Sequence, residues 1–521
     1  MKPRALSIAI FAALAAAVLL ALCGAARRSA AGDEFGSIWL ASQASPAFIV
    51  SKVMSSDVHP ATPYLLLHAW GRLFGYGDRA MRLLSLVFVL LSLGVVWRLL
   101  PQLVPGLSED QRGLAFLLSC VAPVLWVQAS TARYYALCTF AGLLAISCYL
   151  AWHERPVRSR WVGYVLATAA TFYLHYLLAA LVMASQGLHY AAAKPRRAGR
   201  SWIAAQVLIV ALAVPIVLSS AIPLLTGVNP MLSNRAAEGV AGLQAIPLVL
   251  AGHLFSTFTG GLPFPWHVWV TLPWALALAG LAVADLRGSR LLLGRTIQTL
   301  VILPFLLLAV AIALVLPVAG YFQGVVRVGH IPVLAWVTLG LLVATQQRTA
   351  VRRLLAGIVL ACGAYGLVVH GLDLFSMNQS VPLRSVAGRL AGDPHAIVFH
   401  PFTHGWGDPL RRYAGDMPMF PIGDEIAAER VAEYADLVAR ERPATVWVIR
   451  RNRFSERADE LAGWLSAHRY QAVESTPLQP QGAYDIWFKE RLKSIRALGF
   501  KSSASHPSYW TMTRFERLAA P

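Results

Sequence analysis

Charged side chains are scarce in this sequence. Of its 521 residues only 14% are Asp, Glu, Lys or Arg, whereas 57% are hydrophobic, and the mean hydropathy is +0.56. A soluble domain has about 25% charged residues. A chain with so little charge cannot cover a globule with a hydrated surface, so the sequence predicts a membrane protein.

Cysteine is rare as well, and no glycine-rich phosphate loop is present. The five cysteines all lie in apolar stretches, so the sequence indicates neither a disulfide framework nor a thiolate metal site. The absence of a dinucleotide-binding fingerprint argues against a nucleotide site. The net charge is +19, but no basic strip with interleaved aromatic residues predicts binding of nucleic acid.

Apolar runs of about 20 residues, the length that crosses a bilayer as a helix, predict about 11 transmembrane helices. They lie near residues 5–25, 81–103, 114–132, 134–152, 161–173, 176–192, 203–225, 267–284, 296–316, 328–344 and 354–375. A further apolar stretch, residues 245–258, is interrupted by His253 and fits either another span or an interfacial helix.

Four short basic loops, at residues 153–160, 194–200, 285–295 and 346–353, indicate the orientation. Lys and Arg are held on the cytoplasmic side of a membrane. With a cytoplasmic N-terminus and an odd number of spans, all four loops lie inside and the C-terminus lies outside. Only Arg27 and Arg28 disagree, and their side chains could extend to the headgroups. We therefore expect a multi-pass protein of the inner (plasma) membrane, although the first run also resembles a signal peptide.

Two segments are too long to be simple connections. The first outer segment, residues 26–79, contains an apolar stripe at helical spacing in residues 62–75, with His68 and Arg72 on the other side. This pattern predicts a helix in the outer interface. Residues 377–521 have the composition of a soluble protein, so we expect a membrane domain over residues 1–376 and an extracytoplasmic domain after it.

Strand-like and helix-like runs alternate in the C-terminal domain, which predicts a small α/β fold. The expected strands are residues 396–400, 445–450 and 484–489, and the expected helices are residues 425–440 and 456–468. The stretch from residue 493 to the C-terminus has no assignment.

Two acidic motifs lie in the first outer segment. Asp33 and Glu34 follow the first span, where a carboxylate could act as general base on a hydroxyl, although both residues are also common in the first turn of a helix. Asp57 and His59 precede Pro60, and such a pair could position a base and contact a phosphate. Capping of the following helix is the more usual role for an Asp in the position of Asp57.

Ionisable residues also occur at the outer ends of three spans. They are Arg133 with Tyr134 and Tyr135, His175 with Tyr176, and Arg327 with His330. Ionisable groups at membrane depth are costly and usually functional, whereas the tyrosines could equally belong to the aromatic belt of the interface. Because all of them are expected on the outer side, they form a candidate site together with the two acidic motifs.

The order of these motifs resembles the GT-C superfamily of polyprenyl-phosphate-sugar-dependent glycosyltransferases. One span is followed by Asp-Glu, by Asp-x-His-Pro before a Leu-rich amphipathic helix, and by Arg-Leu-Leu-Ser at residues 82–85. Ala-Arg-x-Tyr at residues 132–135 and Tyr-Leu-His-Tyr at residues 173–176 come later. The similarity covers about residues 1–375 and is strongest to bacterial relatives of protein O-mannosyltransferase and lipid A aminoarabinose transferase.

The resemblance implies an inverting glycosyltransferase that moves a hexose or pentose from a polyprenyl-phosphate donor to an extracytoplasmic hydroxyl acceptor. The acceptor would be a glycolipid, a polysaccharide or a protein, and nucleic acid is not expected as a partner. Asp33 corresponds to the catalytic base and Glu34 to its neighbour. His59 stands where the aminoarabinose branch has a lysine that contacts the donor phosphate. No cofactor follows from the resemblance, and a divalent metal stays open.

Other residues of the outer side complete the expected site. Arg133 and Arg327 are candidates for binding the donor phosphate, and Asp57, Tyr135 and His175 for binding substrate. The sequence departs from its relatives at Ala61, where many have a second proline, and at Val328, where an Arg-Tyr pair would be expected. The second departure leaves the role of Arg327 open.

A secondary transporter or a lipid flippase is the main alternative. Transporters usually have internal repeats and Gly- or Pro-broken spans at matching positions, and neither is found here. A ligand receptor with a membrane anchor would need far fewer spans. The sequence therefore favours the transferase.

Overall fold

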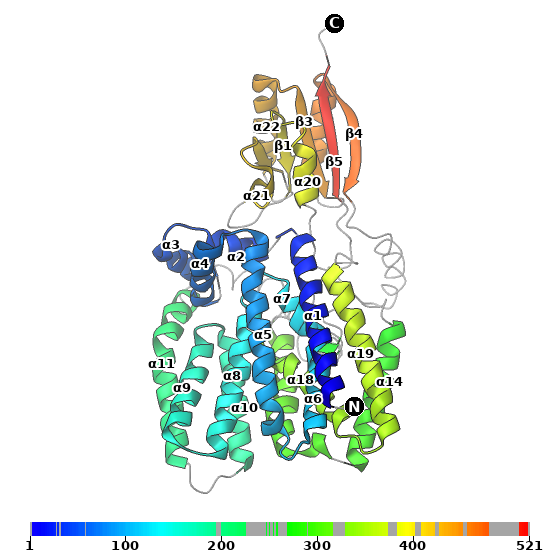
Figure 1. Cartoon of the computed structure of the whole chain (residues 1–521). Coiled ribbons are helices and arrows are strands. Elements are labelled where there is room, and N and C mark those ends of the chain that lie inside the picture. The colour runs from blue at the N-terminus through cyan, green and yellow to red at the C-terminus, as the bar shows by residue number, and fades with distance from the viewer. Residues whose placement is uncertain are drawn as a thin grey trace. The chain divides into compact units, whose positions relative to one another are not determined.

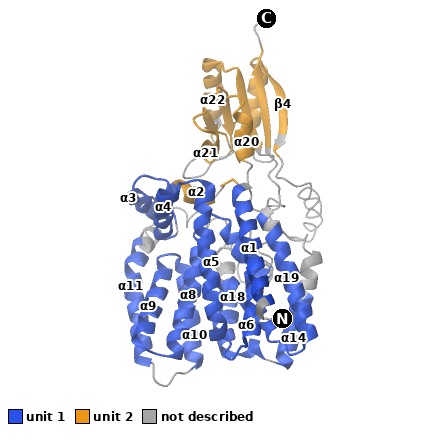
Figure 2. Cartoon of the chain, in the orientation of Figure 1, with its two compact units in different colours: residues 1–27, 40–373 blue, residues 28–39, 374–521 orange. Residues whose placement is uncertain are grey.

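The computed structural model describes most of the chain. The described residues are 3–27, 29–30, 33–57, 59–193, 199–225, 246, 250, 254, 257–258, 268–288, 290–315, 329–372, 383–401, 408–422, 427–451, 456–478 and 510–518. The chain forms two compact units (Figure 2). The helical unit comprises residues 1–27 and 40–373, and the α/β unit comprises residues 28–39 and 374–521.

The helical unit consists of long apolar helices and shorter helical pieces (Figure 1). They are α1 (Pro3–Arg27), α3 (Pro46–Ser56), α4 (Thr62–Phe74), α5 (Asp78–Leu103), α6 (Glu109–Cys120), α7 (Pro123–Ala129), α8 (Tyr135–Glu154), α9 (Arg158–Phe172), α10 (Tyr176–Ala193), α11 (Gly199–Leu225), α14 (Val268–Arg287), η2 (Leu291–Leu293), α15 (Arg295–Ile297), η3 (Gln298–Ile302), α16 (Leu303–Val315), α18 (His330–Ala344) and α19 (Thr349–Leu372). Each expected span coincides with one of these helices or with consecutive pieces. Most of residues 245–258 lie outside the described part.

Six of the described helices are long and apolar enough to cross a membrane. They are Ala5–Ala26, Asp78–Leu103, Tyr135–Glu154, Tyr176–Ala193, Gly199–Ser219 and Thr349–Val368. A seventh span results if α6 and α7, which meet at a bend of 49°, are counted as one. Shorter apolar helices occupy Arg295–Val310 and His330–Ala344. The chain is therefore a multi-pass helical membrane protein, as its composition predicted.

Close helix packing forms the core of the helical unit. α5 packs against α8, α8 against α9, and α18 against α6. The indole nitrogen of Trp336 on α18 donates to the carbonyl of Leu118 on α6 at 2.7 Å. Gly142 lets α8 approach α18, because a Cβ at this position would lie 2.4 Å from Nδ1 of His330. Small residues at such crossings are typical of membrane helices.

Helix α4 is the helix expected in the outer interface, but its packed side is not the expected one. His68 was expected on the polar side, yet it is buried, and its Nδ1 lies 2.8 Å from the carbonyl oxygen of Ala41. Leu73 and Phe74 are 77% and 56% exposed. Apolar residues are stable against lipid as well as against protein, so hydrophobicity does not identify the side of a membrane helix that packs on its neighbours.

The α/β unit is built on a five-stranded mixed sheet. Its strands are β1 (Ile397–His400), β2 (Met419–Pro421), β3 (Thr445–Arg451), β4 (Tyr470–Leu478) and β5 (Trp510–Arg517), in the order β2-β1-β3-β5-β4. The pairs β2–β1 and β1–β3 are parallel, and β3–β5 and β5–β4 are antiparallel, with Val448 opposite Thr513. The expected α/β fold is therefore confirmed.

Helices cover both faces of this sheet, because alternate strand residues point to opposite sides. Trp447 packs with α20 (Leu383–Leu390) and α21 (Arg411–Ala414). Val448 packs with α22 (Ala428–Glu441) and α23 (Glu456–Ala467). The expected elements at β1, β3, α22 and α23 are present, whereas the strand expected at residues 484–489 lies outside the described part. Strands β2, β4 and β5 were not expected, and β5 occupies the stretch that had no assignment.

Candidate active site

Asp57 lies in the turn between α3 and α4. Its Oδ1 accepts a hydrogen bond from Nδ1 of His59 at 2.7 Å, and its Oδ2 accepts one from the hydroxyl of Tyr64 at 2.5 Å. The N-cap of α4 is Ala61, which makes no side-chain capping bond. The capping role expected for Asp57 is therefore wrong, because its carboxylate binds two side chains and not the amides that open α4.

Arg133 lies between α7 and α8 and is only 8% exposed. Its guanidinium group donates to three tyrosine hydroxyls at 3.3–3.4 Å and lies 4.7 Å above the ring of one of them. The three are Tyr64, Tyr134 and Tyr135. Since Tyr134 and Tyr135 are buried against Arg133, they do not belong to a lipid-facing aromatic belt.

Helix α5 holds the turn that carries Arg133. The hydroxyl of Ser85 donates to the carbonyls of Thr131 at 2.7 Å and Arg133 at 3.3 Å. This contact gives the Arg-Leu-Leu-Ser motif a structural role, since its serine fixes the backbone behind the buried arginine.

His175 precedes α10 and completes the group. Its ring centroid lies 5.3 Å from that of His59 and 6.2 Å from that of Tyr134, and the rings of His59 and Tyr134 are 5.0 Å apart. Three turns that are far apart in sequence therefore meet in one place. We call the seven residues the polar cluster: Asp57, His59, Tyr64, Arg133, Tyr134, Tyr135 and His175.

Electrostatics fix the proton positions around Asp57. Burial alone raises the pKa of this carboxyl, but the charge and hydrogen bond of His59, the hydrogen bond of Tyr64 and the charge of Arg133 outweigh it and hold the pKa well below its usual range. Burial raises the pKa of Tyr64 well above its usual value, so this hydroxyl stays protonated and donates. An ionised carboxylate only accepts, so Nδ1 of His59 carries the proton.

Asp33 and Glu34 lie in the α/β unit, in the first turn of α2 (Asp33–Ala41). Asp33 is exposed and Glu34 is half-buried. They therefore occupy the helix-start position that was the alternative to a catalytic role. Adjacent helical residues point in different directions, so the two carboxylates cannot act on the same atom in the same way.

The segment that leads into α2 is bound to the rest of the α/β unit. The amide of Ala30 donates to the hydroxyl of Tyr413 at 2.6 Å. The amide of Arg384 donates to Oγ of Ser29 at 3.2 Å, and its guanidinium group lies 5.6 Å above the ring of Tyr413. The two acidic residues therefore follow a segment that the C-terminal sheet domain holds.

The two remaining expected residues are Arg327 and His330. Arg327 lies outside the described residues. His330 opens α18 and is fully buried, and neither ring nitrogen has a hydrogen-bond partner in the described structure. Tyr64 was not singled out from the sequence. The only signal for it is a tyrosine in the first turn of the helix that follows Asp-x-His-Pro.

Among the described residues, no three His, Cys, Asp or Glu side chains are grouped so that they could hold a metal ion.

The chain is similar in structure to ArnT from Cupriavidus metallidurans, a lipid A aminoarabinose transferase and GT-C enzyme. The apo crystal structure aligns with a TM-score of 0.51 and 16% identity, over 84% of this chain and 92% of ArnT. The structure bound to undecaprenyl phosphate aligns with a TM-score of 0.53 and 15% identity, over 89% and 96%.

No protein-family model matches the sequence, and no curated protein sequence matches it either. At this identity the structural similarity establishes the fold. The GT-C resemblance inferred from the motif order is confirmed at that level.

Proposed function

We propose that this chain is an integral-membrane inverting glycosyltransferase. It transfers a sugar from a polyprenyl-phosphate donor to a hydroxyl on a glycolipid, a polysaccharide or a protein at the extracytoplasmic side. The polar cluster carries this proposal, because it places a buried arginine beside a histidine whose Nδ1 is held by a carboxylate. The fold shared with ArnT supports it, since one ArnT structure holds undecaprenyl phosphate.

The cluster is suited to binding a phosphate. Arg133 is oriented by neutral tyrosine hydroxyls, and its positive charge also acts on the Asp57 carboxylate. His59 receives its orientation from Asp57, so Nε2 is free of that contact and can donate to a phosphate oxygen when the ring is protonated. Charge-assisted hydrogen bonds from Arg to phosphate are among the strongest in proteins.

The proposed reaction is a single displacement. The acceptor hydroxyl oxygen attacks the anomeric carbon, the bond from this carbon to the phosphate oxygen breaks, and its electron pair stays on the phosphate. Arg133 and His59 stabilise the negative charge that develops there. Asp33 takes the proton of the acceptor hydroxyl as general base, and Glu34 orients the acceptor or Asp33. One displacement inverts the anomeric configuration.

The proposed orientation places the N-terminus in the cytoplasm and the C-terminal part of the α/β unit outside, in the inner (plasma) membrane. The four basic loops support this orientation. The donor phosphate then lies at the outer interface while its polyprenyl chain stays in the bilayer.

A comparison of strains tests the function and identifies the sugar. A strain that lacks the chain is expected to lose one sugar mass increment from a glycolipid, glycan or glycoprotein, and the wild-type chain restores it. Complementation with Asp33→Asn should not. An unchanged envelope profile in the deletion strain would contradict the proposal.

A second measurement separates a transferase from a transporter or flippase. In detergent no membrane divides two compartments, so transport has no consequence, whereas a transferase still releases polyprenyl phosphate. Extracted lipid-linked sugars from the deletion strain serve as donor, and its envelope fraction serves as acceptor. Release of polyprenyl phosphate by the purified wild-type chain supports the transferase. If a folded preparation releases no polyprenyl phosphate, the result favours the transporter.

A further inference from the structure

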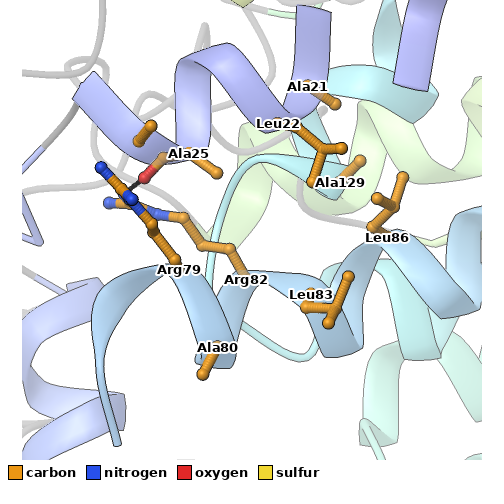
Figure 3. Close-up of a pocket in the computed structure, with 10 residues that line it drawn as sticks. Ala21, Leu22, Ala25, Arg79, Ala80, Arg82, Leu83, Leu86 and Ala129 are labelled. Carbon is orange, nitrogen blue, oxygen red and sulfur yellow. Dashed lines mark hydrogen bonds between the residues drawn. The ribbon is translucent and has the colours of Figure 1, made fainter. Parts of the chain in front are cut away.

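A pocket of about 360 Å3 lies in the helical unit, between α1, α5 and α7 (Figure 3). Leu22 of α1, Leu83 and Leu86 of α5, and Ala129 of α7 form much of its wall. Its volume is at the lower end of the roughly 300–1,000 Å3 typical of small-ligand sites. No residue of the polar cluster lines it, so the pocket is distinct from the candidate active site.

Two arginines, Arg79 and Arg82, lie at one end of the pocket. Figure 3 shows the side chains of Arg79 and Arg82 directed toward the end at Ala25. Arg82 is 1% exposed, and its Nη1 donates to the carbonyl of Ala25 at 2.8 Å. Arg79 is exposed and forms no ion pair with any residue that the structure describes. None of the lining residues is acidic.

The apolar part of the pocket includes side chains that are exposed on two candidate membrane-spanning helices. Leu22 and Leu83 are 44% and 38% exposed, and they belong to two helices that are long and apolar enough to cross the membrane. The arginine end lies where α1 ends and α5 begins. Helix ends carry their charged side chains at the level of the lipid headgroups.

We infer that this pocket binds one acidic phospholipid. An acyl chain lies against α1, α5 and α7, and Arg79 binds the headgroup phosphate. Arginine is suited to this task because its fork of N–H donors matches the oxygens of a phosphate. The charge at one end and the apolar wall elsewhere match the two parts of such a lipid.

The pocket volume of about 360 Å3 is enough for part of one acyl chain. The binding of such a lipid does not depend on the proposed enzymatic activity.

Native mass spectrometry of the full-length protein tests the inference. Phosphatidylglycerol and phosphatidylcholine with identical acyl chains are the probes. The wild type should retain one phosphatidylglycerol in preference to phosphatidylcholine. Arg79→Gln should weaken its retention about fivefold, the equivalent of about 1 kcal/mol for one arginine near an anionic headgroup. Arg72→Gln, which removes an exposed arginine of α4 outside the pocket, should behave like the wild type.

A second pair of variants tests the apolar wall. Ala80 lines the pocket and is half-buried, so Ala80→Leu should fill the space and displace the lipid, whereas Ala80→Ser should retain it. Equal retention of the two lipids by the wild type, equal losses in Arg79→Gln and Arg72→Gln, or bound lipid in Ala80→Leu would overturn the inference. Displacement of phosphatidylglycerol by undecaprenyl phosphate, one for one, would assign the pocket to the polyprenyl lipid instead.

Discussion

The two compact units carry different parts of the proposed chemistry. In the helical unit, Arg133 is buried, the side chain of Asp57 is only 8% exposed, and both are fixed by neighbouring side chains. In the α/β unit, Asp33 is exposed and Glu34 is half-buried on the first turn of a short helix. A phosphate is bound best by preorganised, desolvated cations, whereas a general base must be open to an acceptor that arrives from outside. Burial therefore distinguishes the two proposed roles.

The first outer segment contributes residues to both units. Residues 28–39 belong to the α/β unit although they follow α1 directly, and the next residues return to the helical unit. Tyr413 and Arg384 hold the start of this segment. We therefore propose that the C-terminal domain positions the segment that carries the acidic pair.

The largest expected effect concerns the side of the membrane on which the C-terminus lies. A reporter enzyme that works only in the cytoplasm, fused after Pro521, should be inactive, and one that works only outside should be active. A fusion in the basic loop at residues 346–353 should give the opposite pattern and serves as control. Cytoplasmic activity after Pro521 would refute the proposed orientation and the assignment of Asp33.

The second prediction removes the proposed base. Asp33→Asn keeps the shape of the side chain but cannot accept a proton, so single-turnover transfer should fall about 10²- to 10⁴-fold. Binding of undecaprenyl phosphate should be unchanged, because the proposed phosphate ligands lie in the other unit. Glu34→Gln should lose less. Near-normal transfer by Asp33→Asn would disprove the mechanism, and a larger loss in Glu34→Gln would move the base by one residue.

The third prediction concerns the helical unit. Arg133→Gln removes a charge-assisted contact to phosphate of about 1.5–3 kcal/mol, so affinity for undecaprenyl phosphate should fall roughly ten- to a hundredfold. Arg72→Gln is the matched control, since Arg72 is exposed on α4 and outside the polar cluster. Equal affinities of these two variants would show that Arg133 serves the packing of the turn and not the donor.

The smallest expected effect tests the link between the acidic segment and the C-terminal domain. Tyr413→Phe removes the hydroxyl that binds the amide of Ala30, a bond worth about 1 kcal/mol, so turnover should fall about fivefold at unchanged affinity for undecaprenyl phosphate. Tyr434→Phe removes a similar bond to Pro421 in the same unit and should leave turnover unchanged. Equal turnover in both variants would separate the sheet domain from catalysis.

Much of the architecture was predictable because membrane helices are encoded locally. A run of about 20 apolar residues must satisfy its own backbone hydrogen bonds in lipid, so each expected span coincides with helical structure. Motif order also singled out Asp57, His59, Arg133 and His175, which the structure brings together. Strands β1 and β3 were found for a similar reason, since their apolar runs are short and bounded by turns.

Contacts between distant parts of the chain were not predictable. Strand β5 follows β4 only after a long interval, and their pairing decides that both are strands. Hydrophobicity could not show that His68 is buried, since lipid and protein stabilise apolar side chains alike. The partners of Asp57 depend on where Tyr64 and Arg133 lie in space.

The sequence alone determined the membrane class of the protein, the positions of its helices and the residue types available for chemistry, because each depends on neighbouring residues and on the bilayer. Only the tertiary structure decided that Arg133 is surrounded by tyrosine hydroxyls and that the segment before Asp33 is held by Tyr413. These contacts join residues that are far apart in the chain, and only folding brings such residues together.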